Sequence, residues 1–147
     1  TGLYNRAFFE EEMARIARGR HFPVSVIMVD VDDLKATNDS LGHAAGDELL
    51  RRTAEVLGVS FRAEDMVARI GGDEFAMVLP NTDTSATSEV LKRIRDKLAE
   101  YNAIHKEAPL KLSLGSATAE KGETLAEAMK LADERMYEAK HGKMARS

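Results

Sequence analysis

The feature that most constrains this chain is a nearly continuous apolar run from Val24 to Val31, rich in β-branched residues. A run of this length bounded by polar residues is typical of a strand that is buried on both faces of a sheet. The run ends abruptly in acids, at Asp30, Asp32 and Asp33. The sequence therefore predicts a buried strand whose end carries a group of carboxylates.

The rest of the chain alternates between helical and extended patterns. The spacing of apolar residues predicts helices over 5–18, 33–39, 45–57 and 85–101, and strands over 66–70, 75–79 and 110–114. Strict alternation in the last strand ends at Gly115. Thr124 and Glu127 predict a capping box that opens a final helix, which His141-Gly142 would close. This order favours an α/β (α+β) fold with a mostly antiparallel central sheet flanked by helices.

Composition narrows the class of protein. The 147 residues are 44% hydrophobic, which fits one domain over residues 1–147. A net charge of -4 argues against a nucleic-acid polymer as partner, because duplex binding rests on a cationic face. The lack of cysteine excludes thiol chemistry and suits the cytoplasm. No apolar run is long enough to span a membrane, and we expect this domain to make no membrane contact. The chain opens at Thr1 without Met, which suggests a fragment of a longer sensory protein. Whether that longer protein is anchored in a membrane stays open.

Carboxylates gather in two places that a sheet can bring together. One is the strand end Asp30-Val31-Asp32, and the other is the predicted hairpin turn Gly71-Gly72-Asp73-Glu74. Carboxylates with a backbone carbonyl are hard oxygen ligands, which suit Mg²⁺ bound together with substrate phosphates. The glycines would let phosphate oxygens approach backbone N–H groups. The alternative is a set of solvated turn residues, since Asp and Gly favour turns for local reasons.

The turn and its flanks resemble a known family. Arg69-Ile70-Gly71-Gly72-Asp73-Glu74-Phe75 is similar to the signature of GGDEF domains, the diguanylate cyclases. Further matching segments are the opening run 1–6, the D-x-D-x-F-K-x-x-N-D stretch at 30–39 with Leu34 in place of Phe, the G-H-x-x-G-D stretch at 42–47, and the A-D-x-x-x-Y-x-A-K pattern at 132–140. The resemblance covers nearly the whole chain and implies a palm-like fold with the signature turn on a β-hairpin.

The resemblance also implies a reaction and the residues that would carry it out. A diguanylate cyclase condenses two GTP into cyclic di-GMP, releases two pyrophosphates and works as a homodimer. Mg²⁺ or Mn²⁺ would be held by Asp30, the Val31 carbonyl, Asp73 and Glu74. Asp73 and Glu74, with Lys35, would be the catalytic residues, and Lys35 would pair with phosphates as a mobile point charge.

Further positions would bind substrate and product. Asn38 and Asp47 would contact the guanine edge, with the Asp47 carboxylate accepting from the donors that adenine lacks. Gly71 and Gly72 would approach phosphates. Arg62 and Asp65 match the family's R-x-x-D inhibitory product site, although the same pair could be a surface ion pair of small value.

The final helix departs from the family. The usual A-K-x-x-G-R-N is one residue shorter here, so Lys140 would still bind phosphate but its companion is either Lys143 or Arg146. His43 is expected to be structural.

Three other functions stay open. The chain could be a catalytically silent GGDEF module that binds GTP or cyclic di-GMP as a sensor, but keeping Asp30, Lys35, Asp73 and Glu74 favours the enzyme. It could be a different nucleotidyl cyclase, against which Asp47 argues because it suits guanine. A purely structural scaffold comes last.

Overall fold

The computed structural model describes residues 6–32, 39, 42–58, 62, 64–106 and 109–146, with residues 43 and 143–146 described by their backbone alone. The elements follow in the order α1 (Arg6–Ala17), β1 (Val24–Val31), α3 (His43–Gly58), β2 (Met66–Arg69), β3 (Glu74–Leu79), α4 (Thr84–Ile104), β4 (Leu112–Ala119), the 3₁₀ helix η1 (Gly122–Thr124) and α5 (Leu125–Arg146).

The described strands form one four-stranded sheet in the order β2-β3-β1-β4, and every neighbouring pair is antiparallel. All eight residues of β1 are buried, as the apolar run predicts. Because β1 lies between β3 and β4, Asp30 is paired with Glu74 on one side and with Ser113 on the other. The mixed fold with a flanked antiparallel sheet is confirmed.

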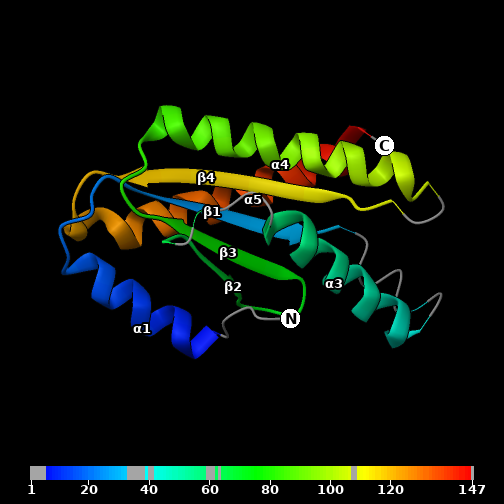
Figure 1. Cartoon of the computed structure of the whole chain (residues 1–147), viewed down its shortest axis with the longest axis horizontal. Helices are drawn as coiled ribbons and strands as arrows, with labels where there is room; N and C mark the ends of the chain where they lie inside the picture. Colours follow the sequence, from blue (N-terminus) through cyan, green and yellow to red (C-terminus); the bar gives the residue numbers. More distant parts are fainter. Residues whose placement is uncertain are drawn as a thin grey trace.

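The sheet separates two apolar cores, since successive side chains of a strand point to opposite faces. Val24, Val26 and Met28 belong to the core that also contains residues of α1 and α5. Ile27 and Val29 belong to the other core, which α3 and α4 cover. In Figure 1, α3 and α4 lie in front of the sheet and α5 passes behind it. Asp30 falls in the alternation of Val26 and Met28, and it therefore faces α5.

Gly115 does not end the last strand, contrary to the prediction from its alternation. It lies inside β4, which continues to Ala119. A Cβ atom at Gly115 would lie 2.2 Å from both the Ala132 carbonyl oxygen and the Met136 nitrogen. Glycine is needed here because the backbone of α5 packs directly on the strand.

The final helix differs from its prediction at both ends. Thr124 lies in η1, and its Oγ1 donates to the Lys121 carbonyl at 2.9 Å, so the predicted capping box is not what opens α5. The helix also continues through Gly142 to Arg146. The packing of one long helix face on β4 and β1 outweighs the weak stop signal of a single glycine. The helix predicted over 33–39 lies outside the described residues, apart from Asp39.

Candidate functional site

The sheet brings the two predicted carboxylate groups together. Asp30, at the end of β1, lies opposite Glu74 at the start of β3. The Val31 N–H donates to the Asp73 carbonyl at 2.9 Å, which extends the pairing by one residue into the turn. The strand end and the hairpin turn therefore form a single edge that carries Asp30, Asp73 and Glu74.

The carboxylate of Asp30 is the unusual group of this edge. Its side chain is only 7% exposed, and its Oδ2 accepts from the Lys140 Nζ at 2.8 Å. Its Oδ1 is buried and has no hydrogen-bond partner among the described residues. Burial raises the pKa of Asp30, the hydrogen bond from Lys140 opposes that rise, and the neighbouring Asp73 adds to it. Since buried acceptors are normally satisfied, this oxygen is suited to a further ligand.

Glu74 lies on a pocket of about 300 Å³ beside the same edge. The charged side chains that line the pocket are those of Arg6, Glu74, Lys130 and Asp133, and its apolar lining includes Met28 and Met129. Burial raises the pKa of Glu74, and the charge of Asp133 on α5 is the next cause. The sequence pattern at 132–140 contains Asp133 but does not show that Asp133 lines the same pocket as Glu74, because that depends on where α5 packs.

Two arginines donate hydrogen bonds to backbone carbonyls of the signature turn and its flank. The Arg69 Nη2 donates to the Gly72 carbonyl at 2.8 Å, and its Nε donates to the Gly71 carbonyl at 3.2 Å. The Arg6 Nη1 donates to the Ile70 carbonyl at 3.1 Å, which joins the start of α1 to the base of the hairpin. No local sequence pattern indicates the Arg6 contact, since 64 residues separate its partners.

The two glycines of the turn are not required by its own conformation. Within the described part of the chain the only glycine with positive φ is Gly42. A Cβ atom at Gly72 would meet no heavy atom of the described residues within 4 Å, and one at Gly71 would make only ordinary contacts with Glu74. At these two positions glycine therefore leaves the turn without side chains and does not supply a positive φ.

A cation at this edge would not find a complete set of protein ligands. Among the residues that the structure describes, no three acidic or histidine side chains are grouped to hold a metal ion. The fit is that of a partial shell: the unpartnered Oδ1 of Asp30, the neighbouring Asp73 carboxylate and the Val31 carbonyl are hard oxygen donors. Such a shell suits Mg²⁺ or Mn²⁺ that brings its remaining oxygen ligands with it.

Several predicted site residues are not placed by the structure. Lys35 and Asn38 lie outside the described residues, and so does the side chain of Lys143. Asp47 is described, in α3 one turn after the helix begins, and it is exposed. The predicted contact of Asn38 and Asp47 with one base stays a prediction.

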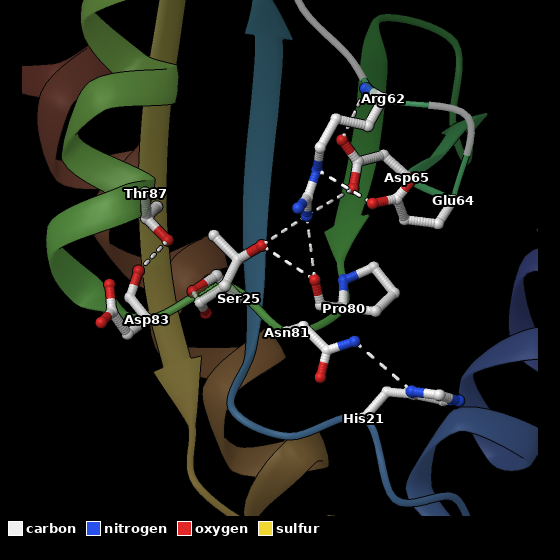
Figure 2. A network of polar contacts seen from close by, with 10 residues as sticks. His21, Ser25, Arg62, Glu64, Asp65, Pro80, Asn81, Asp83 and Thr87 are labelled. Carbon is white, nitrogen blue, oxygen red and sulfur yellow. Dashed lines mark hydrogen bonds and ion pairs between the residues drawn. The ribbon is translucent and has the colours of Figure 1, made fainter.

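Arg62 and Asp65 come together as expected, but their side chains are already engaged (Figure 2). The Asp65 side chain is 3% exposed and accepts from the Arg62 N–H at 2.9 Å and from its Nη2 at 3.3 Å. The same Nη2 donates to the Pro80 carbonyl at 3.0 Å and to the Thr82 Oγ1 at 2.8 Å. A ligand that uses both side chains must therefore replace contacts within the chain.

The chain is similar to known proteins over nearly its whole length. The family model described as "Diguanylate cyclase, GGDEF domain" matches residues 1–146. The chain is 33% identical over 146 residues to the probable diguanylate cyclase DgcT of Escherichia coli, and 34% identical over 148 residues to the response regulator PleD of Caulobacter vibrioides. Both alignments cover 95% of this chain but only 32% and 33% of those proteins. The chain thus spans less than two thirds of the curated relatives that it matches.

Solved structures show the same likeness. The GGDEF domain of DgcB from Caulobacter crescentus, solved in complex with c-di-GMP, has a TM-score of 0.85 and 29% identity, with 97% of this chain and 88% of that chain covered. The active GGEEF domain of a diguanylate cyclase from Vibrio cholerae has a TM-score of 0.82 and 29% identity, with 95% and 92% covered. Within the described residues, no helix has both the length and the apolar character to cross a membrane.

Because the family model matches residues 1–146, the chain belongs to the GGDEF domain family of diguanylate cyclases.

Proposed function

We propose that this chain is an active diguanylate cyclase, which condenses two GTP into cyclic di-GMP and releases two pyrophosphates. The observation that carries the proposal is the buried Oδ1 of Asp30, which has no hydrogen-bond partner among the described residues, at an edge shared with Asp73 and Glu74. A family member released from catalysis has no chemical need for an unsatisfied buried carboxylate oxygen. Because its substrate is GTP, we place the domain in the cytoplasm, whether or not the parent protein is anchored in a membrane.

Asp30, the Val31 carbonyl, Asp73 and Glu74 would hold Mg²⁺ or Mn²⁺. When bound, the cation neutralises phosphate charge and lowers the cost of deprotonating the ribose 3′-OH. The carboxylates of Asp73 and Glu74 are the groups of the turn that can take up this proton. Burial raises the pKa of Glu74, which brings the group closer to the range of a useful general base.

The chain's other residues would bind and orient the nucleotide. The open space over Gly72, and the lack of any side chain at Gly71, fit the close approach of phosphate oxygens, since the turn itself does not require glycine. Lys35, Lys140 and Lys143 would pair with phosphates. Asn38 and Asp47 would select guanine, as the family resemblance implies.

Two protomers are needed for the complete reaction. Each protomer would hold one GTP, and the 3′-oxygen of each nucleotide would attack the α-phosphorus of the other. Two P–O bonds form, two are broken, and two pyrophosphates leave. The homodimer thus supplies proximity and alignment that a single bound nucleotide lacks.

The product would inhibit the enzyme at Arg62 and Asp65. The guanidinium can donate hydrogen bonds to phosphate or to guanine, and the neighbouring carboxylate can accept them from the N–H donors of the base. The inhibited state would be favoured only by the product's higher affinity for an unproductive arrangement of the protomers.

The test is incubation with GTP and Mg²⁺ followed by mass-spectrometric identification of the product. It should be run on the isolated chain and on a fusion to a dimerising coiled coil, because two half-sites must face each other. We expect cyclic di-GMP from the fusion, and none from the same fusion carrying Asp73→Ala. Binding of GTP without turnover in the dimeric fusion would instead identify a silent sensor and contradict the proposal.

A further inference from the structure

Lys140 and Asp30 form an ion pair that the sequence analysis did not anticipate. The Lys140 Nζ lies 2.8 Å from the Asp30 Oδ2, with side chains that are 32% and 7% exposed. The pair joins α5 to the end of β1 across 110 positions of sequence. It stands at the edge where the hairpin carboxylates meet, so it belongs to the candidate site and not to the outer surface.

The two partners have separate tasks in the proposed function. Asp30 would bind a divalent cation, and Lys140 would bind a phosphate. They cannot do so while paired, because the ammonium takes one carboxylate oxygen and its charge repels a cation at the other. The remaining oxygen, Oδ1, has no partner among the described residues, so Lys140 is the cation that Asp30 has in this structure.

We propose that Lys140 acts as a resident counter-ion that keeps divalent metal off Asp30 until a nucleotide arrives. The nucleotide phosphate then takes over the ammonium, and the metal takes over the carboxylate. Lysine suits this exchange because its charge sits on a flexible four-carbon stem, and Lys140 is exposed enough to turn toward solvent. Metal and nucleotide therefore bind with positive coupling, each raising the affinity of the other by the same factor. This inference rests on the proposed function.

The test measures the affinity for Mn²⁺ alone, by the electron paramagnetic resonance signal of free Mn²⁺, in nucleotide-free protein. It also measures the affinity for a non-reacting GTP analogue, with a methylene between the α- and β-phosphorus, at saturating Mn²⁺. Lys140→Met should bind Mn²⁺ alone about 5- to 150-fold more tightly than wild type, which is the usual range of coupling between sites. The same variant should bind the analogue more weakly. These opposite signs are not expected from a lysine that only stabilises the fold.

Two controls separate the ion pair from general electrostatics and from misfolding. Lys92→Met removes the same charge from α4, on the other face of the sheet, where Lys92 pairs with the exposed Asp96, and it should leave the Mn²⁺ affinity near that of wild type. Lys140→Arg keeps the charge and should keep the weak binding of Mn²⁺ alone. Adding Asp30→Asn to Lys140→Met should abolish the gain, which shows that the gain arises at Asp30.

Failure of this inference can be told from failure of the proposed function. If wild type binds the analogue with Mn²⁺ but Lys140→Met binds Mn²⁺ alone no better than wild type, the exchange is overturned while the proposed function stands. If wild type binds neither metal nor analogue under any condition, the proposed site is wrong and the exchange falls with it. An equal gain in Lys92→Met would also overturn the exchange, since net charge would then explain it.

Discussion

Replacing Gly115 by alanine tests whether direct contact between α5 and β4 holds the site together. The added Cβ would lie 2.2 Å from the Ala132 oxygen and 2.2 Å from the Met136 nitrogen, more than an ångström inside ordinary van der Waals contact. Both atoms are helix backbone and cannot rotate away as a side chain would. Overpacking of a core costs about 1–3 kcal/mol, and we expect the upper end here, about 3 kcal/mol. At roughly 2–4 °C per kcal/mol, that lowers the melting temperature by about 6–12 °C.

The assay is thermal and urea-induced unfolding followed by circular dichroism, with Gly142→Ala as the matched control. Gly142 lies in α5 as well, but a Cβ there would meet no described heavy atom within 4 Å. Alanine at that position should leave stability unchanged or raise it by about 1 kcal/mol, through helix propensity. Equal melting temperatures for the two variants would refute the claim that the α5 backbone rests on Gly115.

Three further predictions follow from described contacts and proposed roles. Ser25→Ala should lower the free energy of unfolding, measured in urea, by about 1–3 kcal/mol. The substitution removes a buried hydroxyl that donates to the Thr82 carbonyl at 2.8 Å and is hydrogen-bonded to the Thr118 Oγ1 at 2.7 Å, and an unchanged unfolding midpoint would contradict the prediction. Asp47→Ser should narrow the preference for GTP over ATP in competition assays, and an unchanged ratio would remove Asp47 as a base-binding residue. Arg62→Ala should keep the synthesis of cyclic di-GMP but lose inhibition by the added product. If calorimetry showed that this variant binds cyclic di-GMP as tightly as wild type, Arg62 and Asp65 would be only a surface ion pair.

The sequence was sufficient for elements whose signal is local. The apolar run of β1 and the two strands around Gly71-Gly72 are short patterns with strong propensity, and the structure confirms them. Their antiparallel pairing then brings Asp30 opposite Glu74. The shared carboxylate edge could be predicted because it needs only one strand end and one hairpin turn.

Contacts between distant elements could not be predicted in the same way. The Asn102 side chain makes both backbone hydrogen bonds of Leu110: it accepts from the Leu110 N–H at 2.8 Å and donates to the Leu110 carbonyl at 2.9 Å. Nothing in the local sequence pattern indicates this contact. Gly115 seemed to end a strand because alternation takes no account of a helix packed on the backbone. The contact of Lys140 with Asp30 depends on where α5 crosses the sheet, which is a property of the assembled fold.

The most direct test of the central claim is the ratio of pyrophosphate to cyclic di-GMP produced from GTP and Mg²⁺ by the dimerised chain. Pyrophosphate would be followed by a coupled enzymatic assay and the cyclic product by quantitative mass spectrometry over the same time course. The proposed reaction requires two pyrophosphates for each cyclic di-GMP, and neither product from the matched Asp73→Ala protein. Bound GTP that stays intact in a folded, dimeric wild-type protein would contradict the proposal that this edge of the sheet is a catalytic site.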